Sequence, residues 1–177
     1  QKRRCQYLPV EKLVPKLLDK GLFSAWEEDA TIVQSSRKRL EGEFLVVAEL
    51  ADGEIRSVTG ELLQEASRFT DNVSVLLVGH DTGKHHQYFS ARGAKQIYVA
   101  DAPQLAEYGT EKYSEILKRV IQETAPTAVL LPSTSQGRDW APRVAGRLQL
   151  GLTGDCVGLD LDEKGQLLQY KPAFGGN

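Results

Sequence analysis

Four short runs of apolar residues constrain the fold of this chain more than any other feature of its sequence. Each run is continuous, which is typical of strands that are covered on both faces of a sheet. Stretches with helical periodicity separate the runs, and this alternation predicts βαβ units and a parallel sheet. We therefore expect a three-layer α/β domain with right-handed crossovers. The runs lie at residues 44–48, 73–78, 97–100 and 128–131.

Three of the intervening stretches predict helices with a recognisable start. Thr59, Thr110 and Asp139 each precede apolar residues at helical spacing and are suited to cap a helix. Pro142 would then fall in the first turn of the third helix, where proline is tolerated.

The last part of the chain predicts a β-hairpin. Residues 155–162 and 166–171 flank the tripeptide Glu163-Lys164-Gly165, which is suited to a turn. We expect this hairpin to extend the sheet at its C-terminal end.

Residues 1–42 differ from residues 43–177 in their apolar pattern and in their charge. They show no strand pattern and carry more Lys and Arg than Asp and Glu, whereas the whole chain has a net charge of -2. We predict an N-terminal extension or linker over residues 1–42, followed by one domain over residues 43–177.

Composition excludes several classes of partner. A pI near 6.0 argues against a nucleic-acid partner. The absence of a long apolar stretch argues against membrane insertion. Cys5 and Cys156 form no CxxC motif, so neither a zinc site nor a dithiol centre is predicted, and two free thiols fit a reducing cytoplasm. The three histidines lack the spacing of a metal site.

Ligands of open α/β sheets bind outside the carboxyl ends of the strands, so the loops that follow the apolar runs are the candidate sites. Residues 79–84 read GHDTGK, one residue too short for a phosphate loop and without its Ser or Thr. We interpret them as an ordinary turn. Glu49, at the end of the first run, is either a paired structural carboxylate or a loop ligand, and we favour the structural role.

The loop at residues 132–138 is the strongest candidate for binding an anion. Ser133, Ser135, Gly137 and Arg138 lie where a strand leads into a helix, and helix N-termini favour negative charge. The alternative is that the hydroxyls satisfy the helix N–H groups themselves, and the sequence leaves both readings open. Further along, Arg143 and Arg147 share a helix face, which predicts an ion-paired surface or a partner surface.

The C-terminal part of the sequence resembles a known family. Residues 130–150 read LLPSTSQGRDWAPRVAGRLQL, and residues 151–177 read GLTGDCVGLDLDEKGQLLQYKPAFGGN. Together they closely resemble the electron-transfer flavoprotein alpha subunit. Upstream, the strand at Val46–Glu49 and the segment at Ala91–Ala94 resemble the same family, so the resemblance covers about residues 43–177.

The resemblance implies a fold and a function. Alpha subunits have a first α/β domain, similar to adenine-nucleotide-binding folds, and a second domain that binds most of the FAD. This chain looks like the first domain, ending before the FAD domain, so FAD is expected in the intact protein and no cofactor in this part. The first domain packs on the beta subunit, and the assembly carries electrons from dehydrogenases to an acceptor. The resemblance therefore implies an electron carrier subunit of the bacterial cytoplasm that is not catalytic alone.

Two residues of the family pattern receive a structural role. Arg143 and Asp155 both lie in that pattern, and we expect them to pair, as an interface or structural contact. The alternative function is a free-standing adenine-nucleotide-binding module of the stress-protein type.

Overall fold

A four-stranded parallel sheet forms the centre of the molecule. The computed structural model describes residues 39–172. The sheet has the order β5-β4-β1-β6, and the strands coincide with the four apolar runs, which confirms the predicted α/β class. Their bounds are β1 (Phe44–Val47), β4 (Val73–Gly79), β5 (Gln96–Asp101) and β6 (Ala128–Leu130).

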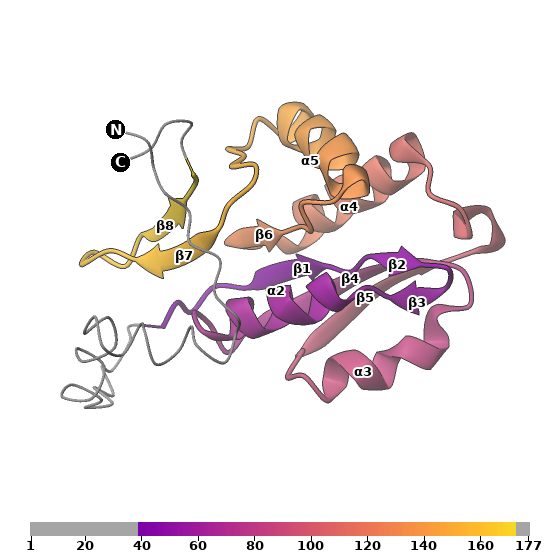
Figure 1. The fold of residues 1–177 in the computed structure, drawn as a ribbon, viewed down its shortest axis with the longest axis horizontal. Coiled ribbons are helices and arrows are strands. Elements are labelled where there is room, and N and C mark those ends of the chain that lie inside the picture. Colours follow the sequence, from indigo (N-terminus) through magenta and orange to yellow (C-terminus); the bar gives the residue numbers. More distant parts are fainter. Residues whose placement is uncertain (1–38, 173–177) are drawn as a thin grey trace, which may run out of the picture. The chain divides into compact units, whose positions relative to one another are not determined.

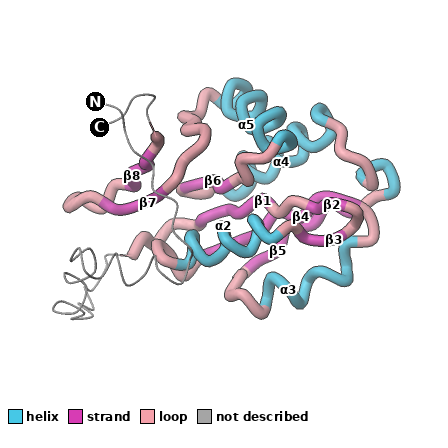
Figure 2. Tube along the Cα trace, viewed as in Figure 1, coloured by secondary structure: helices cyan, strands magenta, loops and turns pink. Residues whose placement is uncertain are grey.

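Helices cover both faces of the sheet (Figures 1 and 2). Helices α2 (Ser57–Ser67) and α3 (His86–Ser90) lie on one face, and α4 (Thr110–Thr124) and α5 (Ser135–Leu148) lie on the other. Side chains alternate along β1: Phe44 packs with the α2 side and Leu45 with the α4 and α5 side. Every residue of β1 and β4 is buried, which explains why their sequences are apolar without alternation.

A small antiparallel pair, which the sequence analysis missed, follows β1. Strands β2 (Leu50–Ala51) and β3 (Glu54–Ile55) are joined through Asp52 and Gly53. Both turn residues have positive φ, 52° and 74°, as a two-residue hairpin turn requires. Asp-Gly is a hairpin signal, but the flanking strands are too short to show alternation. Two short 3-10 turns complete the connections, η1 (Thr82–His85) and η2 (Pro103–Leu105).

The predicted C-terminal hairpin is confirmed, but its expected place in the sheet is wrong. Strands β7 (Gly158–Leu161) and β8 (Leu167–Tyr170) pair only with each other, as a separate two-stranded sheet. Leu159, Leu161 and Leu167 pack against the core cluster on the α2 side. Side-chain packing, and not backbone pairing with the central sheet, therefore attaches the hairpin.

The helix starts differ from the predicted caps. Helix α2 begins at Ser57 after Arg56, so Thr59 lies inside the helix and is fully buried. Helix α4 begins at Thr110 itself, after Gly109.

Helix α5 starts earlier than predicted, at Ser135, with Thr134 as its N-cap. Asp139 is consequently inside the helix, and so is Pro142, which falls beyond the first turn. A proline there has no N–H to donate, so the carbonyl of Arg138 loses its helical partner.

The predicted extension, residues 1–42, lies almost entirely outside the described residues. Of its last residues, Arg39 forms an ion pair with Asp71 at 2.7 Å, and the Leu40 N–H donates to the Phe69 carbonyl. These residues therefore contact the segment between α2 and β4.

Candidate functional site

The chain order of the strands reverses between β1 and β6, which are neighbours in the sheet. From β1 the chain passes to β4 on one side, and the later strand β6 pairs on the other side of β1. Such a reversal separates the flanking loops, so ligands of open α/β sheets bind at this point, beyond the carboxyl ends of the strands. Glu49 follows β1 here, and residues 131–134 follow β6. We call this place the switch point.

The Glu49 carboxylate is buried at the switch point, with the residue 4% exposed. Its Oε1 accepts a hydrogen bond from Arg56 Nη1 at 2.6 Å, and its Oε2 accepts one from Thr134 Oγ1 at 2.5 Å. Arg56 is the N-cap residue of α2, and Thr134 is the N-cap residue of α5. One carboxylate thus joins the starts of helices α2 and α5 at the switch point.

The backbone around Glu49 is held as firmly as its side chain. Its N–H donates to the buried Thr59 hydroxyl at 3.1 Å, and its carbonyl accepts from the Arg56 N–H at 3.0 Å. The prediction of a paired structural carboxylate at this position agrees with these contacts. Thr59, which the sequence analysis read as a cap, instead anchors the turn after β1.

The side chain of Thr134 caps the N-terminus of α5. The Gly137 N–H donates to Thr134 Oγ1 at 3.1 Å, so this hydroxyl caps the helix while donating to Glu49. A Cβ at Gly137 would lie 1.8 Å from the Pro132 carbonyl oxygen, so this position requires glycine. Of the two open readings of this loop, the contacts of Thr134 match the one in which hydroxyls satisfy the helix N–H groups.

Ser133 and Arg138 bind a carboxylate of the chain. Asp155 Oδ1 accepts from Ser133 Oγ at 2.6 Å and pairs with Arg138 Nη2 at 2.8 Å. These contacts, first the Ser133 hydrogen bond and then the Arg138 charge, hold the pKa of Asp155 below its usual range. They tie the connector between α5 and β7 back to the start of α5. Ser135 is exposed at the first position of the helix.

The expected pair between Arg143 and Asp155 is wrong. Arg143 Nη2 lies 3.3 Å from Asp139 Oδ1, and Arg138 takes the place at Asp155. The reason is helical geometry: residues four apart share a face, whereas Arg138 and Arg143, five apart, point about 140° away from each other.

Asp139 joins α5 to α4. Its Oδ2 accepts from Tyr108 Oη at 2.8 Å and from Thr110 Oγ1 at 2.5 Å. The Thr110 hydrogen bond is the largest cause of its lowered pKa, followed by Tyr108 and Arg143. Nearby, Arg147 pairs with Glu111 at 2.6 Å. Arg143 and Arg147 therefore form the ion-paired surface that was one of the two predicted readings.

The GHDTGK segment is a turn, as predicted, and two of its N–H groups donate to a carboxylate of the chain. Asp101, at the end of β5, accepts from the Asp81 N–H at 3.0 Å and the Thr82 N–H at 2.8 Å. The Thr82 hydroxyl donates to it at 2.7 Å. The hydrogen bonds from Thr82 are the main cause of the lowered pKa of Asp101.

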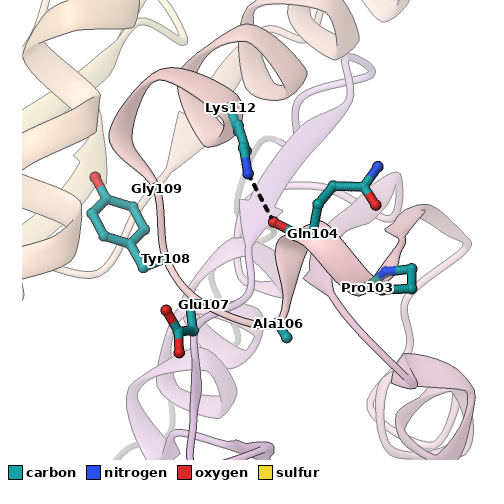
Figure 3. Close-up of a pocket in the computed structure, with 7 residues that line it drawn as sticks. All are labelled: Pro103, Gln104, Ala106, Glu107, Tyr108, Gly109 and Lys112. Carbon is teal, nitrogen blue, oxygen red and sulfur yellow. Dashed lines mark hydrogen bonds between the residues drawn. The ribbon is translucent and has the colours of Figure 1, made fainter.

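One open surface cavity lies elsewhere, around η2 and the start of α4 (Figure 3). It encloses about 370 Å³, and Lys112 Nζ donates across it to the Gln104 carbonyl at 3.2 Å. None of the predicted site residues lines it. Its lining residues are Pro103, Gln104, Ala106, Glu107, Tyr108, Gly109 and Lys112.

Within residues 39–172, His, Cys, Asp and Glu side chains form no group that could hold a metal ion. In the same part of the chain, none of the helices has the length and apolar character needed to cross a membrane. Cys156 is exposed, and its Sγ lies 3.0 Å from the Gly158 carbonyl oxygen.

Comparison with known proteins identifies relatives over most of the chain. It is 43% identical over 136 residues to an electron transfer flavoprotein subunit alpha from Thermoanaerobacterium thermosaccharolyticum, covering 75% of this chain and 41% of the relative. The subunit from Clostridium acetobutylicum is 38% identical, with 75% and 41% covered. The lactate dehydrogenase (NAD(+),ferredoxin) subunit LctC of Acetobacterium woodii is 34% identical over 170 residues, covering 94% of this chain and 40% of LctC.

The chain thus spans about 41% of the length of the first two relatives. These matches favour the electron-transfer reading over a free-standing nucleotide-binding module. The family model for the electron transfer flavoprotein domain matches residues 44–177, which include the whole central sheet and the switch point. The chain therefore belongs to the electron transfer flavoprotein family.

Proposed function

We propose that this domain is the scaffold part of an electron transfer flavoprotein alpha subunit. Together with a beta subunit, the intact protein would carry electrons from dehydrogenases to a downstream acceptor, and this domain would not be catalytic alone. The observation that supports this most is the family match over residues 44–177, to relatives that are themselves alpha subunits.

We infer that the described residues do not hold the flavin. The pyrophosphate of FAD needs free N–H or hydroxyl donors, usually at a helix N-terminus. In the two candidate loops at residues 79–84 and 132–138, Thr82, Ser133 and Thr134 already donate to the chain's own carboxylates, Asp101, Asp155 and Glu49. We therefore propose that FAD in the intact protein is bound outside residues 39–172. FAD supplies the redox chemistry when bound, and the described residues provide a rigid α/β body.

Exposed apolar side chains offer a surface for the beta subunit. Val157 is 72% exposed and lies in the connector that Arg138 and Ser133 hold in place through Asp155. Large exposed apolar residues mark interaction surfaces when they gather. Five of them lie along the connector and β8, two segments that meet where the Val157 N–H donates to the Tyr170 carbonyl. The residues are Leu150, Leu152, Val157, Leu168 and Tyr170.

A second candidate is a role inside a dehydrogenase complex. The match to LctC covers 94% of this chain, against 75% for the two alpha subunits, so it extends into the N-terminal segment. LctC is named as a subunit of an NAD(+)- and ferredoxin-dependent lactate dehydrogenase. This observation favours a parent complex of that kind. A bacterial cytoplasmic location remains a prediction.

Flavin reduction tests the proposed function. The complete reading frame that contains this chain would be co-expressed with a beta subunit from the same organism. We expect a yellow heterodimer whose absorbance near 450 nm bleaches when a partner dehydrogenase and its substrate are added. A colourless product, or a flavin that no dehydrogenase reduces, would contradict the proposal. Lactate as the effective electron source would support the second candidate.

A further inference from the structure

The outer edge of β5 is the longer of the two open edges of the central sheet. Strand β5 stands at one end of the strand order and pairs with β4 on its inner side. It has six residues, whereas β6, at the other end of the order, has three. Within residues 39–172 no other segment pairs with the outer side of β5. An edge of this kind leaves backbone N–H and C=O groups available to another strand.

The backbone groups of alternate residues face this open side. Directly before β5, the Lys95 N–H donates to the Val73 carbonyl at 2.8 Å. Backbone groups alternate in direction along a strand, so those of Ile97 and Val99 face β4 as well. The residues whose N–H and C=O groups face outward are therefore Gln96, Tyr98 and Ala100.

The sequence of β5 lacks the features that usually protect an exposed edge. Proteins commonly protect an edge with a proline, a bulge or a charged residue within the strand. Residues 96–100 read QIYVA, without charge or proline, and the charged residues Lys95 and Asp101 flank them. Val99 is 43% exposed and adds apolar surface beside the edge. The edge is thus suited to accept a further strand.

The backbone of β5 is complementary to a second copy of itself in one antiparallel register. In an antiparallel ladder, outward-facing residues pair with outward-facing residues and exchange both hydrogen bonds. If Tyr98 of one copy lies opposite Tyr98 of the second, Gln96 lies opposite Ala100 at both ends. This register engages every outward-facing N–H and C=O group of both strands, and it has two-fold symmetry.

The side chains are complementary in the same register. Val99 would lie opposite Ile97 of the second copy, in the closer type of cross-strand pair, and would lose its exposure to water. Lys95 would lie opposite Asp101, and symmetry makes this pair of opposite charges occur twice. Lys95 is exposed, and the Asp101 side chain remains 34% exposed. Both charges are therefore accessible to a second copy.

We propose that two copies of this chain associate through β5, which joins their central sheets into one continuous sheet. The contact is one strand wide, which is typical of a weak interface, so we expect a dissociation constant on the order of 100 µM or lower. The residues involved differ from the exposed apolar residues of the connector and β8, to which the beta subunit is assigned. This association and the proposed function can therefore fail independently.

Sedimentation equilibrium of the 177-residue chain, from about 10 µM to about 1 mM, provides the first test. The buffer would contain a reductant, because Cys156 is exposed and could form a disulfide dimer. We expect a reversible monomer–dimer equilibrium. Val99→Lys places a charge on the edge and should weaken the dimer at least about tenfold. Lys95→Glu places like charges opposite each other at Asp101 and should weaken it at least about threefold.

The same two changes at exposed positions elsewhere are the matched controls. Val157→Lys alters the connector and Lys164→Glu alters the turn of the C-terminal hairpin, and both residues are exposed. Neither should change the dissociation constant more than about twofold. If the controls weaken the dimer as much as the β5 variants do, another surface or a general charge effect is responsible and the proposal is overturned.

Amide hydrogen exchange, followed by NMR at low and high protein concentration, tests the register. Protection of the outward-facing amides of Gln96, Tyr98 and Ala100 should rise with concentration, while the amides of Ile97 and Val99, which face β4, should change little. A chain that stays monomeric at about 1 mM would overturn the proposal. So would a dimer that leaves the outward-facing amides unprotected. If Val99→Lys fails to fold, Lys95→Glu decides, since Lys95 is exposed and precedes the strand.

Discussion

Two glycines of α5 should respond to the same substitution with opposite signs. At Gly137 an added Cβ would lie 1.8 Å from the Pro132 carbonyl oxygen, whereas at Gly146 it would meet no atom within 4 Å. Gly137 is buried beside the helix cap, and Gly146 is exposed near the other end of the helix. The structure therefore has room for an alanine side chain at Gly146 and none at Gly137.

The cost of Gly137→Ala follows from what must move. The carbonyl and the new methyl must separate by roughly 1.5 Å or more to reach an ordinary contact. That shift breaks the hydrogen bond from the Gly137 N–H to Thr134, worth about 1 kcal/mol for a helix cap. Strain of the overpacked site adds about 1–3 kcal/mol. We expect Gly137→Ala to lower the free energy of unfolding by about 2–4 kcal/mol.

Gly146→Ala is the control in the same helix. Alanine loses less backbone entropy than glycine on forming a helix, so we expect a gain of about 0.5–1 kcal/mol. Urea unfolding followed by circular dichroism measures both, with similar m-values expected for the two variants and wild type. A cost below about 1 kcal/mol for Gly137→Ala would refute the contact between Gly137 and Pro132, because the typical substitution already costs that much.

Two other predictions concern the core and the response to acid. Leu45 of β1 is fully buried against helices α4 and α5. Leu45→Ala should therefore lower the free energy of unfolding, measured by urea titration, by about 2–5 kcal/mol. The pKa of Asp139 is lowered in the folded state. Its carboxylate therefore stabilises the fold above its unfolded pKa of about 3.9, and this stabilisation is lost as the pH falls through the folded pKa. Asp139→Asn should therefore flatten the fall of the thermal midpoint below about pH 4; an unchanged acid profile would count against the contacts of Asp139 with Thr110 and Tyr108.

The central sheet could be predicted from the sequence because a strand buried on both faces is a continuous apolar run, which is visible within a few neighbouring residues. The apolar runs at β1 and β4 need no knowledge of their neighbours to be read as covered strands. The C-terminal hairpin was predicted for a similar reason, since Gly165 sits between two strand-like segments. Its attachment was not predictable, because packing of Leu159 and Leu167 on a distant core leaves no local pattern.

The candidate site was predicted less well, since its contacts join residues far apart in the chain. Glu49 and Thr134 are 85 positions apart, and Thr134 was noticed only as part of a polar loop. The helix caps failed for a related reason: Thr59 and Thr110 have the right chemistry, but their hydroxyls bond to Glu49 and Asp139 instead of to their own helices. The pairing of Arg138 with Asp155 required knowledge of the connector path.

The central claim is that this domain serves as a scaffold for a beta subunit. Sedimentation velocity of the 177-residue chain, mixed with a separately purified electron transfer flavoprotein beta subunit from the same organism, tests this claim most directly. The account predicts a one-to-one complex in place of the free chain, weakened by Val157→Asp, which puts a charge on an exposed apolar residue of the proposed surface. Sedimentation of the two proteins as independent species at micromolar concentrations would contradict it.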